Sequence, residues 1–215
     1  MTATAPRSRR RKDGEATRQR ILDAAVECIL EKGYYEASSN EIARTAGVTW
    51  GALQHQFGSR QALLLEVLED RWGKLLARIE SAEIDGATLE ERLQSVLEVL
   101  SSHYGQPEHL VQLQILLDLS RNPDSSKEVR RATKRYGAEL THAWEPLFAQ
   151  ALGDAAGETD LVVYAFTTLR AYIQARLIAA SIADTAGDSV PRALLVRGIA
   201  AAIREAADQR GIPLP

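Results

Sequence analysis

The chain has 215 residues, of which 45% are hydrophobic and 26% are charged, and its formal net charge is −3. These values are ordinary for a soluble globular protein, and the length allows one large domain or two small ones. A single cysteine, Cys28, excludes a disulfide framework and a cysteine-rich metal site. The basic N-terminus is not followed by an apolar stretch, and the apolar segment 161–183 contains polar residues, so we expect a cytoplasmic protein.

The composition favours an all-α fold, because 33 Ala and 27 Leu outnumber 23 Val and Ile by more than two to one. We expect about nine helices. Residues 1–20 contain seven Lys or Arg against two acidic residues, which hints at a polyanionic partner, although a solvated tail would look the same. Residues 1–16 show no apolar periodicity and are predicted to be a disordered basic arm. A first helix is predicted over 17–32, with Gly33 ending it.

Two short helices follow the first one. Ser38 and Glu41 have the spacing of a capping box, which predicts a helix start. Gly47 ends this helix. Thr49 is then the N-cap of a second short helix, Trp50–Phe57. After it, a serine caps a long fourth helix.

The two short helices have the spacing of a helix-turn-helix, in which the second helix presents a slender polar face to a DNA major groove. Leu53 and Phe57 are one turn apart and are predicted to point inward. The positions left outside are Trp50, Gly51, Gln54 and His55. Because Trp50 has the spacing to pack partly with Leu53 and Phe57, both a DNA contact and a core position remain open for it.

At this point the sequence resembles the TetR family of bacterial transcriptional regulators. The residues that carry the resemblance lie in register between 21 and 63. They are Ile21-Leu22-Asp23-Ala24-Ala25, Gly33-Tyr34, Ser38, Glu41-Ile42-Ala43, Ala46-Gly47-Val48-Thr49, Gly51-Ala52-Leu53, Phe57 and Ser59-Arg60-Gln61-Ala62-Leu63. The C-terminal part agrees with the family only in the number and length of its helices.

The resemblance implies three DNA-binding helices and a helical body that binds a small effector and dimerises through its last two long helices. It also implies that the capping hydroxyls of Ser38 and Thr49 contact DNA phosphates, as does Arg60. It places Trp50 and Gly51 against the bases. The helix-turn-helix domain would span 17–62 with its motif at 38–57, and 63–215 would form the effector-binding and dimerisation domain.

The sequence departs from the family in its recognition helix. The family commonly has a tyrosine after the leucine of this helix, and here that position is Gln54, so a tyrosine–phosphate contact is not carried over. Gln54 can instead bind a phosphate or an adenine edge. The predicted DNA-binding residues are Arg9, Arg10, Arg11, Ser38, Thr49, Trp50, Gly51, Gln54, His55 and Arg60.

Longer helices are predicted at 88–104, 107–120, 124–151, 159–183 and 190–209, with a kink or break near Pro146 inside the third. We expect any effector pocket among the first four, mostly apolar with a few directed polar groups. The candidate lining residues are His103, Gln114, His142, Tyr164, Phe166 and Arg170, and simple surface exposure or core packing is the alternative for each. Arg170 leaves room for a carboxylate on the effector.

The last two helices are apolar and rich in small residues. Ala171, Ala175 and Ala179 are four residues apart, and the last helix contributes Ala200. This seam predicts a two-fold, four-helix interface and therefore an inverted-repeat DNA site.

The sequence thus predicts a homodimeric transcriptional regulator that binds double-stranded DNA. Such a regulator is most often a repressor, which a small lipophilic effector releases from a palindromic operator. Two alternatives remain: a regulator without a small ligand that is controlled by a protein partner, and a helical enzyme or small-molecule carrier. The four histidines lack metal-ligand spacing, and there is no Gly-rich phosphate loop or catalytic triad. We therefore expect no enzymatic activity, no cofactor and no metal.

Overall fold

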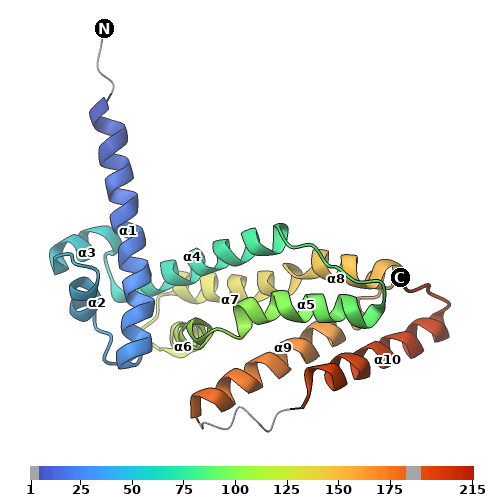
Figure 1. The fold of residues 1–215 in the computed structure, drawn as a ribbon. Coiled ribbons are helices and arrows are strands. Elements are labelled where there is room, and N and C mark those ends of the chain that lie inside the picture. Colours follow the sequence, from blue (N-terminus) through green and yellow to red (C-terminus); the bar gives the residue numbers. More distant parts are fainter. Residues whose placement is uncertain (1–4, 183–189) are drawn as a thin grey trace. The chain divides into compact units, whose positions relative to one another are not determined.

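The structure is a computed structural model that describes residues 5–182 and 190–215, and this part of the chain consists of helices and connecting loops (Figure 1). The α-helices are α1 (Ala5–Lys32), α2 (Ser39–Thr45), α3 (Trp50–Phe57), α4 (Arg60–Glu80), α5 (Leu89–Tyr104), α6 (Pro107–Arg121), α7 (Lys127–His142), α8 (Glu145–Leu152), α9 (Thr159–Ile182) and α10 (Arg192–Arg210). A 3-10 helix, η1 (Gly153–Gly157), follows α8. The predicted all-α fold is confirmed. In the described ranges, no helix has the length and apolar character needed to cross a membrane.

Helix α1 begins earlier than predicted. Residues 5–16, expected to be a disordered arm, are helical, and residues 1–4 lie outside the described residues. The segment is rich in Arg, Lys and Ala, which are strong helix formers, and Pro6 stands in the first turn, where its missing N–H costs nothing. Within the extension, the Thr17 hydroxyl donates to the carbonyl oxygen of Asp13 at 2.8 Å. Apolar periodicity detects helices that bury one face, so it does not detect a helical segment whose sequence has no apolar period.

The predicted interruption near Pro146 is confirmed. Helix α7 ends at His142 and α8 begins at Glu145, with Pro146 in the first turn of α8. Proline fits there because the first turn of a helix leaves its N–H groups without partners anyway. The helical run predicted over 124–151 therefore consists of two helices, α7 and α8.

The chain divides into two compact units. The first comprises residues 1–73 and 110–136, and the second comprises 74–109 and 137–215. The boundaries fall inside α4, α6 and α7. This division differs from the predicted one between residues 62 and 63, because 110–136 pack with the N-terminal helices.

The first unit has an apolar core to which both of its segments contribute. Ile21 and Cys28 of α1 are fully buried in it, and α6 adds Val111, Ile115 and Leu119. Burial raises the pKa of the Cys28 thiol. These observations agree with the prediction that Cys28 is a small core residue rather than a reactive thiol.

The second unit is built around α5, which packs against α8, α9 and α10. Its interior contains an aromatic cluster with Tyr104, Trp144 and Phe166. The Trp144 Nε1–H donates to the Tyr104 hydroxyl at 3.0 Å, so the one polar atom of the buried indole is satisfied. The Trp144 and Phe166 rings are stacked, with centroids 6.0 Å apart.

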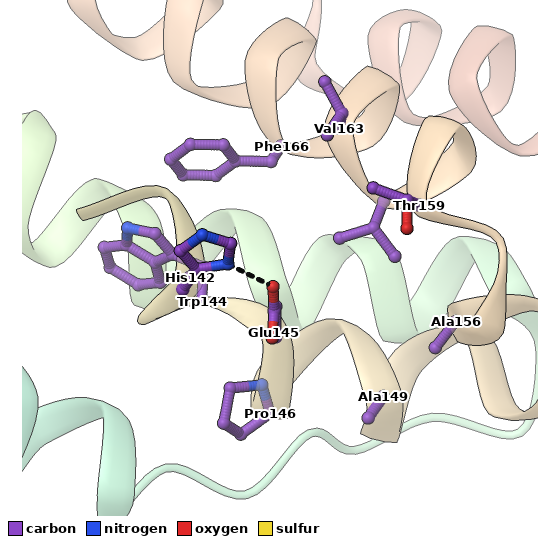
Figure 2. A pocket seen from close by; sticks show the side chains of 10 residues that line it. His142, Trp144, Glu145, Pro146, Ala149, Ala156, Thr159, Val163 and Phe166 are labelled. Atoms are coloured by element: carbon purple, nitrogen blue, oxygen red, sulfur yellow. Dashed lines mark hydrogen bonds and ion pairs between the residues drawn. The ribbon is translucent and has the colours of Figure 1, made fainter. Parts of the chain in front are cut away.

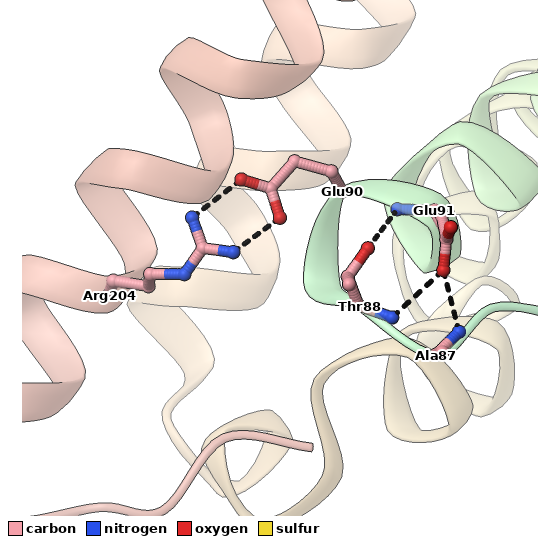
Figure 3. Close-up of polar contacts among 5 residues, drawn as sticks. All are labelled: Ala87, Thr88, Glu90, Glu91 and Arg204. Carbon is pink, nitrogen blue, oxygen red and sulfur yellow. Dashed lines mark hydrogen bonds and ion pairs between the residues drawn. The ribbon is translucent and has the colours of Figure 1, made fainter.

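An ion pair and a helix cap fix the start of α5 (Figure 3). Arg204 of α10 makes a bidentate contact with the carboxylate of Glu90. Beside it, Thr88 and Glu91 form a complete capping box: the Thr88 hydroxyl accepts from the Glu91 N–H at 3.3 Å, and the Glu91 carboxylate accepts from the Thr88 N–H at 3.0 Å. The cap thus fixes the first turn of α5, and the ion pair joins this turn to α10.

Candidate DNA-binding face and effector cavity

The hydroxyls of Ser38 and Thr49 cap α2 and α3 as predicted. Ser38 Oγ accepts from the N–H of Glu41 at 3.3 Å, and Thr49 Oγ1 accepts from the N–H of Ala52 at 3.1 Å. Both capping residues are exposed. Each hydroxyl acts as an acceptor in its cap and retains its proton, with which it can donate to an external oxygen. The caps are therefore compatible with phosphate contacts.

The capping box predicted at Ser38 is only half formed. The Glu41 carboxylate pairs with Lys32 and, at 2.9 Å, with Arg44 instead of returning to the Ser38 N–H. That N–H already donates to the carbonyl oxygen of Glu36 at 2.8 Å. Hydrogen bonds from Arg44 and Lys32 lower the pKa of Glu41 to about 2. Glu41 thus joins the end of α1 to α2.

The outward face of α3 carries the residues expected there. Leu53 and Phe57 are buried, whereas Trp50 is 53% exposed and His55 is exposed. The exposure of Trp50 favours its DNA-contact interpretation over the core interpretation. Gly51 is exposed, and a Cβ added to it would meet only Thr49 Oγ1, at 4.0 Å. Packing within the protein therefore does not require a glycine here, whereas close approach of an external molecule would.

Gln54 has an intramolecular partner that the sequence did not indicate. Its side-chain Nε2 donates to the carbonyl oxygen of Gly58, the residue that ends α3. The amide is thereby folded along the helix toward its C-terminus. A bidentate contact of Gln54 with a base requires the side chain to leave this position.

Arg60, which was predicted to contact a phosphate, has partners within the protein. Its Nη2 donates to the carbonyl oxygen of Tyr34 at 2.7 Å and its Nε to that of Ala37 at 3.4 Å. The guanidinium carbon lies 4.6 Å from the centroid of the Tyr34 ring. These partners hold the connection between α1 and α2, so the described contacts of Arg60 are internal rather than directed to a phosphate. The side chains of Arg9, Arg10 and Arg11 lie outside those that the structure describes.

A cavity of about 400 Å³ lies in the second unit (Figure 2). Its lining is mainly apolar and consists of His142, Trp144, Glu145, Pro146, Ala149, Ala156, Thr159, Val162, Val163 and Phe166. His142 Nδ1 lies 2.7 Å from Glu145 Oε1. The volume is within the range of small-molecule sites. The break between α7 and α8 shapes this cavity, because His142 ends α7 and Glu145 and Pro146 begin α8.

Two of the six predicted pocket residues line this cavity, His142 and Phe166. Tyr164 is 42% exposed on α9, and Gln114 is exposed on α6 in the first unit. Arg170 lies over the Phe166 ring, 5.0 Å from its centroid, but is not among the lining residues.

His103 packs against Tyr104 and His109 instead. Burial, followed by the nearby His109 and Arg78, lowers the pKa of His103 to about 3. Sequence reasoning missed Glu145 and Thr159, which line the cavity. The predicted break at Pro146 could have indicated Glu145, because the first residues of a helix lie at its open end.

The predicted dimer seam is exposed on α9 but not on α10. Ala171, Ala175 and Ala179 are exposed, whereas Ala200 is fully buried and packs inside its own unit. Ala200 is not part of an exposed seam, because it lies on the side of α10 that faces the core of its unit. The residues that α10 presents outward include Leu194, Gly198 and Ala201.

The N-terminal helices are similar to those of a known protein family. Residues 21–67 match the family model described as bacterial regulatory proteins, tetR family. A curated relative, the fatty acid metabolism regulator protein of Bacillus subtilis, is 33% identical over 84 residues, which cover 39% of this chain and 42% of the relative. The chain thus matches about two fifths of the length of that relative.

Solved structures extend the likeness to the whole fold. A putative TetR-family transcriptional regulator from Mesorhizobium loti has a TM-score of 0.64 at 19% identity, covering 91% of this chain and 97% of its own. The transcriptional regulator FadR from Bacillus subtilis, in complex with stearoyl-CoA, has a TM-score of 0.59 at 21% identity and covers 86% of this chain and 96% of its own. At these identities the likeness shows the fold.

Proposed function

We propose that this chain, which carries the DNA-binding helices of the tetR family of bacterial regulatory proteins, is a homodimeric transcriptional regulator that binds an inverted-repeat operator and is released by a lipophilic effector. The outward face of α3 carries the proposal. Trp50, Gly51 and His55 are exposed on a helix whose opposite side is buried in the core. A helix of this kind, braced by α2, can enter a major groove.

The cavity in the second unit supports the effector. It is lined mostly by apolar side chains and has the size of a small-molecule site. A fold with the same arrangement of helices, that of FadR, holds stearoyl-CoA, so helical bodies of this type can accommodate a lipophilic ligand. A regulator without a ligand, controlled only by a protein partner, is less favoured because it would have no need of such a cavity.

The exposed side of α9 and α10 supports the dimer. Ala171, Ala175 and Ala179 form a row of small residues at intervals of four, and Gly198 lies on the outward side of α10. A Cβ added to Gly198 would meet no atom within 4 Å, so the protomer itself does not require glycine there. Small residues on both helices would allow the helices of a second copy to approach closely.

Recovery of bound genomic fragments by the full-length protein tests the proposal. We expect enrichment of one inverted-repeat sequence, whereas enrichment of unrelated sequences would contradict it. Trp50→Ala should weaken binding to that sequence. Leu117→Ala serves as the matched control, because Leu117 is an equally exposed apolar residue on α6.

The basic N-terminal residues are proposed to follow the DNA backbone. Deleting residues 1–12 should weaken binding to all sequences and lower the log–log salt dependence by about 0.9 for each phosphate that these residues neutralise. Binding measured between low and moderate salt gives this slope. An unchanged slope would show that these residues do not bind phosphates.

A further inference from the structure

The polar side of the effector cavity is acidic. Glu145 is the one acidic side chain among its lining residues, and neither Lys nor Arg lines it. The Glu145 carboxylate is held in place by His142 at 2.7 Å and lies at the first turn of α8 (Figure 2). It is thus an exposed carboxylate, paired with His142, beside an apolar surface.

A second acidic feature adjoins the cavity. Thr159, which lines it, lies between Glu158 and Asp160 in the sequence. Both carboxylates bind the same guanidinium, since Arg210 contacts Glu158 at 2.6 Å and Asp160 at 2.7 Å. Two carboxylates and one guanidinium leave one negative charge in excess. This excess charge has the same sign as Glu145, whereas the Arg170 guanidinium, 5.0 Å from the centroid of the lining Phe166 ring, has the opposite sign.

Arg170, the residue predicted to leave room for an effector carboxylate, has other partners. The Arg170 guanidinium lies on the face of the Phe166 ring and interacts with the Tyr104 hydroxyl. Burial raises the pKa of Tyr104 to about 12, and Trp144 and Arg170 offset only part of this rise. Arg170 is outside the lining of the cavity. An effector carboxylate in the cavity would therefore meet Glu145 rather than Arg170.

We infer that the cavity binds an aromatic or otherwise apolar molecule that carries a cationic amine, with the amine against Glu145 and the apolar body toward Val163 and Phe166. Electrostatic complementarity favours this charge, and the aromatic residues Trp144 and Phe166 are among those that line the cavity. This inference rests on the proposed function, because it names the ligand class of the same effector site.

Three probes with one skeleton and different charge test the inference: naphthylmethylamine, naphthylmethanol and naphthoate, each titrated into the full-length protein by calorimetry. We expect the amine to bind about tenfold more tightly than the carboxylate, with the alcohol between them. Such a ratio corresponds to ~1.4 kcal/mol, of the size expected for one partly exposed charge that attracts one probe and repels the other.

Two variants and a control assign the preference to a residue. Glu145→Gln keeps the shape of the side chain and should remove the preference for the amine. Glu98→Gln, which removes an exposed acidic charge from α5 of the same unit, should leave it unchanged. Arg170→Gln should also leave the order of the three probes unchanged.

Tighter binding of naphthoate, with its loss in Arg170→Gln, would overturn the inference, as would failure of all three probes to bind. Operator affinity is measured separately in each case. An amine that binds through Glu145 without changing operator affinity would support the ligand class and contradict the effector switch of the proposed function. Operator binding without amine binding would support the DNA-binding part of the proposed function and contradict the ligand class.

Discussion

Thr49 is the residue on which the first turn of the candidate recognition helix depends. Thr49→Ala removes the acceptor for the Ala52 N–H and should lower the free energy of unfolding by about 1 kcal/mol. Thr49→Ser keeps the oxygen and should remain close to the parent protein. Urea denaturation of the three proteins measures the difference. Equal stability of the Ala and Ser variants would show that the cap contributes nothing.

Tyr34 gives the first unit a defined sensitivity to alkaline pH. Its hydroxyl is buried and donates to Asp118 Oδ2 at 2.7 Å. Burial and then this hydrogen bond raise the pKa of Tyr34 to about 12, above the value of about 10 expected in the unfolded chain. The folded state therefore binds the phenolic proton more tightly, and its contribution to stability is complete below pH 10 and is lost as the pH rises to 12.

Tyr34→Phe should remove this contribution, which is on the order of 2 kcal/mol, and with it part of the decline in unfolding free energy between about pH 10 and 12. Denaturant titrations across that pH range measure the decline. Tyr35→Phe is the matched control, because the Tyr35 side chain is 90% exposed. An identical alkaline decline in Tyr34→Phe and the parent would contradict the assignment.

The role of a residue can be predicted from the sequence when its partners lie close to it in the chain. The hydroxyl caps at Ser38 and Thr49 could be predicted because their partners lie three residues away in the chain. The partners of Arg60 could not, because Tyr34 and Ala37 approach it only after α1 and α4 have packed. Long charged side chains bind whichever groups the fold brings near, so their roles depend on tertiary structure.

Helix α4 contains a glycine at the boundary between the two units. Gly73 is exposed, and a Cβ added to it would meet no atom within 4 Å. Gly73→Ala should therefore raise the free energy of unfolding by about 0.5–1 kcal/mol, because alanine loses less backbone entropy in a helix. Thermal unfolding measures this gain.

Gly86→Ala is the opposite case and a control for the preceding change. Gly86 has a φ of +139°, and its added Cβ would lie 2.6 Å from Glu91 Cβ, so the substitution should destabilise the protein. A destabilised Gly73→Ala protein would show that the space around residue 73 is needed for another purpose.

At the level of elements, the sequence predicted best where local signals mark the ends. The ends of α2 and α3 follow from their caps and glycines, and the break before α8 follows from Pro146. The helical extension of α1 was missed because residues 5–16 have no apolar period. The cavity was predicted only in part, since its lining combines residues of α7, α8, η1 and α9 that only the tertiary structure brings together.

At the level of the whole molecule, the proposed dimer can be tested by one charge. Ala175 is exposed in the row of small residues on α9, and Ala175→Glu would place a carboxylate in an apolar helix contact. We expect monomers that bind an inverted repeat poorly, as measured by light scattering and by titration of the operator. Ala77→Glu on the exposed side of α4 is the matched control. A dimeric Ala175→Glu protein with full operator affinity would exclude this seam.

The passage of the chain between its two units has an evolutionary consequence. The chain crosses from one unit to the other within α4, α6 and α7, and the first unit takes Val111, Ile115 and Leu119 of α6 into its core. A segment that ends at residue 73 would leave that core without these side chains. The DNA-binding helices are therefore not a cassette that one recombination event could transfer to another regulator. New pairings of operator and effector would arise more readily by point substitutions within a lineage than by exchange of the DNA-binding helices between proteins.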